Sequence, residues 1–268
     1  MDGALYTRMV KMQARSISGY SLGMVFYLWL FIWVFPSFSG SQSLNNLLRQ
    51  MPAGLMKVLG YTAGITHLSN FLSGEFYSLL YLVIMAIYAI FGATGLVARL
   101  VDSRAMAYLL ATPVSRVRVA ATQAGVLLTG VATIGCATTV GALLGAHWFL
   151  RQGGLDAGRF IEVNIVGALL FSVVAGYCFL FSCLAPDERR ALSLSAILTV
   201  GFYGLHVIGD MSHRFAWMNH LSLFAAFDPQ KLVQGHGHFA ASAIALALVA
   251  AILFAMGIAA FSKRQLAL

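Results

Sequence analysis

Six long stretches without a charged residue divide the chain. They cover positions 16–48, 76–98, 119–150, 163–186, 191–209 and 232–262. A helix needs about 20 apolar residues to cross the hydrocarbon core of a bilayer, and each stretch can hold one. We therefore expect an all-α integral membrane protein with six transmembrane helices, near residues 18–37, 77–99, 119–147, 163–184, 191–208 and 239–261.

The overall composition supports the same class. Of the 268 residues, 60% are hydrophobic and only 10% are charged, whereas a soluble domain has about 25% charged residues. Three cysteines lie inside apolar stretches, and an odd number there is no disulfide framework. These values exclude a soluble enzyme, a disordered chain and a secreted disulfide scaffold.

The net charge of +8 is explained by orientation in a membrane and not by nucleic acid, because the cations lie between the apolar stretches. With the N-terminus inside, four short cytoplasmic segments carry most of the Lys and Arg residues: Arg8, Lys11 and Arg15; Arg99, Arg104, Arg116 and Arg118; Arg189 and Arg190; Lys263 and Arg264. The positive-inside rule then predicts a multi-pass protein with both termini in the cytoplasm. The membrane is expected to be the bacterial plasma membrane.

Residues 4–16 have the pattern of a short amphipathic helix at the membrane surface. Two faces recur at helical spacing, a basic one with Arg8, Lys11 and Arg15 and an apolar one with Leu5, Met9 and Met12. The alternative is a generic positive flank that only sets topology. We expect the following span to be retained, because its apolar part is longer than that of a signal peptide.

The segment between the second and third spans is expected to hold a compact helix and a sharp stop. Asp102 and Ser103 can begin a helix of about 102–111, and Pro113 disfavours helical backbone at Thr112. Met106, Leu109 and Leu110 would form the apolar side of this helix. Arg104 and Arg116 are basic residues in and after it. The alternative is an ordinary basic loop.

Two segments on the expected outer side are half polar: in 43–60 leucines and methionines recur at helical spacing, and in 209–235 polar residues lie among aromatic and apolar ones. Such segments suit helices that dip into the outer interface or shield a pathway, although a folded loop without a transport role is the alternative. The candidate gate or substrate contacts on the outer side are Glu75, Asp210, His213 and Trp217. Glu75 stands just before the second span and can equally be a simple boundary residue.

The third span carries small residues at every fourth position, at Ala137, Gly141 and Gly145. This spacing permits two helices to approach closely and predicts a packing contact.

No energy-supplying site is evident in the sequence. The span centres carry no carboxylate or cation, which argues against a proton-driven carrier. A P-loop needs a Gly-Lys pair, and the chain has none. We therefore expect no catalytic residues and no cofactor or metal bound by this chain; active transport would need another subunit.

Two alternatives stay open. His206, Asp210 and His213 have spacings that would place three metal ligands on one side of a helix, as in an interfacial metal-dependent hydrolase. That helix would have to continue through Gly209, and no H-E-x-x-H motif supplies a base. The other alternative is a carrier or channel that works alone.

The order of these features resembles the membrane-spanning subunits of type-2 ABC exporters. The resemblance is most specific where Leu109, Leu110, Thr112, Pro113, Val114, Ser115 and Arg116 match the leucine-rich stretch before the third span of that family. Asp102, Ser103 and Arg104 replace the usual Glu-x-Gly-Thr, and Gln123 replaces a common lysine.

The resemblance implies a mechanism. Residues 102–111 would be a coupling helix that rests on a separate ATP-binding subunit, present in two copies with ATP and Mg²⁺. Residues 4–16 would be an elbow helix. A second permease chain, identical to the first, would complete a path lined by the first, second and fifth spans, with 209–235 as the outer re-entrant gate. The expected cargo is amphipathic or hydrophobic: a drug, an antibiotic, a peptide or a lipid-like compound.

Overall fold

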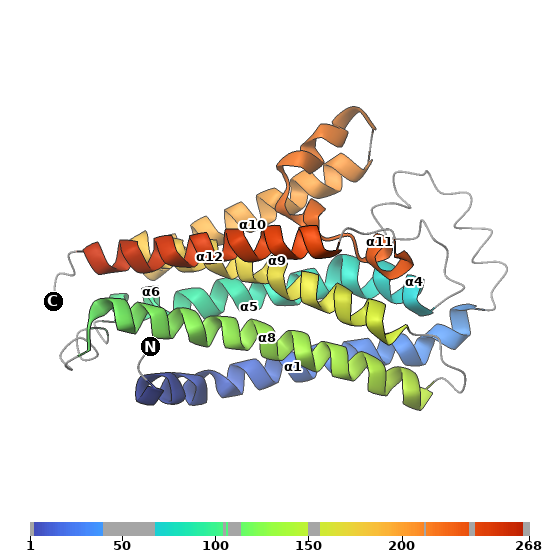
Figure 1. Ribbon diagram of the computed structural model, residues 1–268, viewed down its shortest axis with the longest axis horizontal. Helices are drawn as coiled ribbons and strands as arrows, with labels where there is room; N and C mark the ends of the chain where they lie inside the picture. The colour runs from blue at the N-terminus through green and yellow to red at the C-terminus, as the bar shows by residue number, and fades with distance from the viewer. Residues whose placement is uncertain are drawn as a thin grey trace.

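The computed structural model describes residues 3–39, 68–103, 106, 114–149, 156–211, 213–235 and 239–264. Within these ranges the protein is helical and has no strand, and six helices are long and apolar enough to cross a membrane (Figure 1). Five of them are α1 (Gly3–Ser39), α8 (Arg116–Phe149), α9 (Ala157–Leu184), α10 (Glu188–Met211) and α12 (Phe239–Lys263). The second span is built from α4 (Leu68–Leu72), the π-helix η1 (Ser73–Leu80), α5 (Tyr81–Leu96) and α6 (Ala98–Asp102). Short helices η2 (His213–Leu221), η3 (Leu223–Ala226) and α11 (Pro229–Gln234) follow α10.

The six predicted spans are confirmed, and each helix is longer than its predicted span. The third is one helix of 34 residues, as its long charge-free stretch indicates. Residues 4–16 are helical as expected, but they continue without a break into the first span, so that α1 is a single helix of 37 residues. The three cations on its first turns, Arg8, Lys11 and Arg15, are exposed, and Met9 is buried.

α9 is the centre of the bundle. It packs against α12, α5, α8 and α10, while α1 lies along α8. In an 18-residue apolar stretch of α9, 72% is buried inside the bundle, whereas only 17% of the corresponding stretch of α10 is buried. α10 leans away from the bundle and leaves large apolar side chains such as Ile197 and Val200 about 70% exposed (Figure 1).

α1 begins and α12 ends at the same end of the bundle, which we call the terminal end (Figure 1). The short helix α11 and the start of α4 lie toward the opposite, distal end. α10 also runs toward that end, and η2 folds back along it (Figure 1).

Glycines let the helices approach closely. A Cβ at Gly141 would meet Val25 and one at Gly145 would meet Trp29, and Nε1 of Trp29 donates to the carbonyl of Gly141 at 2.9 Å. The predicted packing role of these two glycines is therefore confirmed. Two tyrosines of α5 also pack against glycines. Tyr88 fills the space beside Gly130, and Tyr81 fills the space beside Gly167.

Arginines hold the helix ends together at the terminal end. The guanidinium of Arg264 donates to the carbonyls of Cys183 (3.1 Å) and Ala185 (2.8 Å), at the C-terminal end of α9. A cation is favourable there because the last carbonyls of a helix carry partial negative charge. Arg116, the first residue of α8, donates in turn to the carbonyl of Arg264 at 2.7 Å.

Candidate functional site

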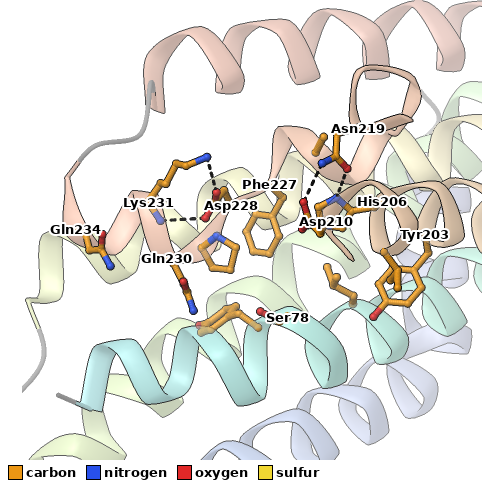
Figure 2. A pocket seen from close by; sticks show the side chains of 15 residues that line it. Ser78, Tyr203, His206, Asp210, Asn219, Phe227, Asp228, Gln230, Lys231 and Gln234 are labelled. Atoms are coloured by element: carbon orange, nitrogen blue, oxygen red, sulfur yellow. Dashed lines mark hydrogen bonds and ion pairs between the residues drawn. The ribbon is translucent and has the colours of Figure 1, made fainter. Parts of the chain in front are cut away.

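A pocket of about 390 Å³ lies toward the distal end, where α10 meets the second span (Figure 2). Its walls come from η1, α5, the last two turns of α10 and the segment from η2 to α11. We call it the distal pocket. Its polar lining consists of Tyr77, Ser78, Tyr203, His206, Asp210, Asn219, Asp228, Gln230, Lys231 and Gln234.

One wall is a π-helix, a conformation that is rare and often found at functional sites. The hydroxyl of Ser78 donates to the carbonyl of Ser73, five residues earlier, at 2.8 Å. Next to it the hydroxyl of Tyr77 lies 3.1 and 2.9 Å from Oδ1 and Nδ2 of buried Asn164 on α9. These contacts fix Tyr77 and Ser78 at the pocket wall.

The opposite wall is a polar cluster that connects α10 to η2. Nδ2 of Asn219 donates to Oδ1 of Asp210 at 2.8 Å, and Oδ1 of Asn219 lies 3.3 Å from Nδ1 of His206 (Figure 2). Nε2 of His206 is 3.7 Å from Oδ2 of Asp210. Asn219 comes this close because residue 209 is glycine, at which a Cβ would meet both the side chain and the backbone of Asn219.

The third wall is the start of α11. Asp228 caps this helix by accepting from the backbone N–H of Lys231 at 3.0 Å, and Pro229 occupies its first position. The ammonium of Lys231 also lies 2.9 Å from Oδ2 of Asp228. The hydrogen bond and the charge of Asp228 raise the pKa of Lys231 above its usual value, so this side chain stays protonated across the neutral range.

Two further cavities border α5 and α10 nearer the terminal end. An apolar groove of about 190 Å³ shares Leu82 and Tyr203 with the pocket. A third cavity of about 390 Å³ lies between α1, α5, α6 and α10, and includes Met12, Phe91, Arg99 and Glu188. All three cavities border both α5 and α10.

The predicted outer-side residues do not all gather at the distal pocket. Asp210 lines it, at the end of α10. Trp217 lies on η2 and is 56% exposed, and the side chain of His213 is outside the described part of the chain. Glu75 does not precede the second span, because the span begins at Leu68; it lies half-buried inside η1.

The predicted coupling residues are described only in part. Met106 is 2% exposed and belongs to the core, and Arg116 holds the end of α12. Asp102 is the last residue of α6 and is followed by the cap residue Ser103. Arg104, Leu109, Leu110 and Pro113 lie outside the described residues.

α10 does continue through Gly209, as a metal site on its surface would require. His206 and Asp210 accordingly face each other. In the ranges that the structure describes, however, no three His, Cys, Asp or Glu side chains are grouped to hold a metal ion. The hydrolase alternative has no support there.

Sequence reasoning missed most of the distal pocket. Tyr77, Ser78 and Tyr203 lie inside apolar spans, where the sequence does not indicate which side of a helix lines a cavity. Asp228 followed by Pro229 is a helix-start signal that could have located α11.

Comparison with known protein families gives a match over nearly the whole chain. Residues 6–262 match the family described as the multidrug efflux system permease Rv1217c, C-terminal domain. No curated protein and no solved structure matches the chain significantly. Because the match covers nearly the whole chain and the six spans agree with it, the chain belongs to this family of multidrug efflux permeases and is a multi-pass membrane transporter.

Proposed function

We propose that this permease is the membrane-spanning subunit of a type-2 ABC exporter, driven by ATP that separate subunits bind and hydrolyse. The observation that carries the proposal is an ion pair at the terminal end. Nε of Arg99 lies 3.0 Å from Oε1 of Glu188. It joins α6, which leads into the expected coupling segment, to the first turn of α10.

This ion pair gives the coupling segment a mechanical connection to the cavities. Arg99 and Glu188 border the third cavity, and α10 continues from there along the apolar groove to the distal pocket. Buried Met106 anchors the same segment to the core. A displacement of the segment by a partner would thus be passed to α10 and α5, the helices that line all three cavities.

The terminal end is the cytoplasmic end in this proposal. The basic residues of α1 and those at the ends of α6, α8, α10 and α12 gather there, as the positive-inside rule requires. ATP-binding subunits would dock on this side. The absence of a Gly-Lys pair from the sequence is consistent with ATP being held by another chain.

A second copy of the permease would face α10 and α5. Both helices expose large apolar side chains, among them Ile197 and Val200 of α10 and Val83 and Phe91 of α5. In this assembly the cavities would form a path between the two copies. Their mixture of polar walls in the distal pocket and apolar walls in the groove suits amphipathic cargo.

The test is reconstitution in liposomes with an ATP-binding subunit that co-purifies with the permease. We expect ATP-dependent efflux from the complex and no flux from the permease alone. Leu109 and Leu110 changed together to Asp should remove association with the ATPase, because two charges would replace the apolar side of the coupling helix. Leu221→Asp is the matched control, since Leu221 is 58% exposed on η2, away from the terminal end.

Two results would refute the proposal: flux from the permease alone without nucleotide, or a double variant that still binds and stimulates the ATPase as well as the control does.

A further inference from the structure

We propose that the third cavity and the exposed cations at the start of α1 together bind one anionic phospholipid, such as phosphatidylglycerol, from the cytoplasmic leaflet. The phosphate would lie at the cations and an acyl chain in the cavity. The inference concerns a resident lipid and not the cargo. From the proposed function it takes only that the terminal end is cytoplasmic, and the binding is tested without any ATP-binding subunit.

The start of α1 presents three cations that no carboxylate of the described residues neutralises. The side chains of Arg8, Lys11 and Arg15 are exposed, and the ion pairs in the described part of the chain do not include them. Arg99, by contrast, is engaged by Glu188. Spacings of three and four residues place the three cations on one side of α1. This side therefore presents positive charge that a phosphate can meet.

The cations lie beside the third cavity. Met12 lines the cavity and is 65% exposed. Arg8 lies four residues before Met12 and Arg15 three residues after it, so that both flank Met12 on the surface of the helix. Hydrogen bonds from a guanidinium to a phosphate are charge-assisted and strong. A phosphate held by these two arginines would lie at the mouth of the cavity.

The polarity of the lining follows the profile of one membrane leaflet. The first charge-free stretch begins at residue 16 and the second ends at residue 98, which places Arg99 and the first turns of α1 at the level of the headgroups. Gln13, Ser16 and Arg99 line the cavity at this level. Tyr20 and Phe91 line its part inside the charge-free stretches. A phospholipid has the same order, with a polar head at the interface and an apolar chain below it.

The cavity has space and adaptable walls for an apolar chain. Its volume of about 390 Å³ is within the usual range for small-molecule sites. Gly95 lines it, and a Cβ at this glycine would have nothing within 4 Å. Met9 and Met12 are unbranched and flexible, which suits a chain without a fixed shape. Tyr20 is held edge-on against Tyr88, with ring centroids 5.5 Å apart, so this part of the wall is fixed.

Native mass spectrometry of the delipidated full chain in detergent tests the site. Phosphatidylglycerol and phosphatidylcholine with the same acyl chains are titrated, and the fraction of the protein with one bound lipid is measured. We expect phosphatidylglycerol to bind on the order of tenfold more tightly, because the cations of α1 attract its net negative charge. Free glycerol phosphate in excess should not compete, since it lacks the acyl chains.

Two triple variants separate a site from the general attraction of lipid to a basic surface. One changes the three cations of α1 to Gln, and should lower the affinity for phosphatidylglycerol to that for phosphatidylcholine. The control removes the same charge from the same end of the bundle and should keep most of the preference. It changes to Gln three exposed cations that do not line the cavity, Arg118, Arg189 and Lys263.

A second pair of variants tests the place of the acyl chain. Gly95→Phe puts a ring into the cavity and should weaken the binding of phosphatidylglycerol several-fold, because the ring takes the space of the chain. Gly201→Phe is the matched control and should bind the lipid like the unaltered protein. It places the same ring in open space on α10, outside the cavity.

Three results would overturn the inference: equal affinity for the two lipids, competition by glycerol phosphate, or a control triple variant that loses the preference as fully as the α1 variant. A Gly95→Phe variant that binds phosphatidylglycerol as tightly as Gly201→Phe would overturn it as well. The exporter proposal fails separately. A complex without ATP-driven flux, whose permease still selects phosphatidylglycerol through α1, would support the lipid site and contradict only the exporter.

Discussion

The carboxylate of Glu188 accepts a hydrogen bond from Nε of Arg99 at 3.0 Å, and so connects the end of the second span to the start of the fifth. The two residues are far apart in sequence. Arg99 is the second residue of α6 and Glu188 the first of α10. Their contact lies at the rim of the third cavity, on the side where an ATP-binding subunit would dock.

The first prediction concerns this ion pair. Arg99→Glu should lower the amount of cargo moved per ATP hydrolysed by the complex, because like charges would separate α6 from α10. The double variant with Glu188→Arg should regain most of the coupling. Thermal stability in detergent should change by no more than about 1 kcal/mol, since the side chain of Arg99 is 65% exposed.

Arg190→Glu provides the control for that experiment. Arg190 pairs with Asp187 at the same end of the bundle, at 3.4 Å, but does not border the third cavity. A loss of coupling as large in this variant as in Arg99→Glu would assign the effect to surface charge and contradict the prediction.

The second prediction concerns the fold of η2 on α10. Gly209→Ala would place a Cβ 2.6 Å from Oδ1 of Asn219 and 3.0 Å from the backbone nitrogen of Asn219. The backbone cannot yield easily, so the change should displace η2, break the Asn219–Asp210 hydrogen bond and cost about 1–3 kcal/mol. Hydrogen exchange over residues 213–221 should become faster.

Gly204→Ala is the matched control, because nothing lies within 4 Å of a Cβ there, on the same helix. Equal hydrogen-exchange rates in the two variants would show that Gly209 does not determine how η2 packs on α10.

Charge-free stretches predicted the six spans because desolvating a charge in a bilayer is costly, but they did not predict where the helices end. Glu75 was taken as a boundary, and the second span instead begins at Leu68. A carboxylate near a helix end can remain half-buried, so it does not force the helix to stop. Leu68, Phe71 and Leu72 provide a buried apolar side before it.

The candidate site was predictable only where its residues share one helix. The spacing of His206 and Asp210 correctly places them together, at 3.7 Å. Asn219 comes from η2, and its contact with both depends on how closely the chain folds back at Gly209, which spacing along one helix does not reveal. The π-helical turn that positions Tyr77 and Ser78 has no signal in the sequence that we used.

The third prediction tests the packing of α5 against α8. Gly130→Ala would drive a Cβ into the ring of Tyr88, which is 2% exposed and has little room to move. We expect a loss of about 1–3 kcal/mol in thermal unfolding. Tyr88→Leu in the same chain should restore part of it, because the bulk of the ring is removed. Gly201→Ala, in open space on α10, should be neutral or slightly stabilising; a Gly130→Ala variant as stable as this one would contradict the prediction.

The last prediction separates structural from coupling roles among the arginines of the terminal end. Arg264→Gln removes two charge-assisted hydrogen bonds that the guanidinium donates to the carbonyls of Cys183 and Ala185 at the end of α9. This change should lower the free energy of unfolding by about 2 kcal/mol. Arg116→Gln should also destabilise, since its guanidinium holds the carbonyl of Arg264. In the protein that remains folded, cargo moved per ATP should stay close to normal in both variants, unlike in Arg99→Glu.

Arg189→Gln, at an exposed position of α10, is the control for charge. An Arg116→Gln protein that is as stable as this control but uncoupled would place Arg116 in the coupling contact, as the sequence resemblance implies, and would contradict the structural role assigned to it.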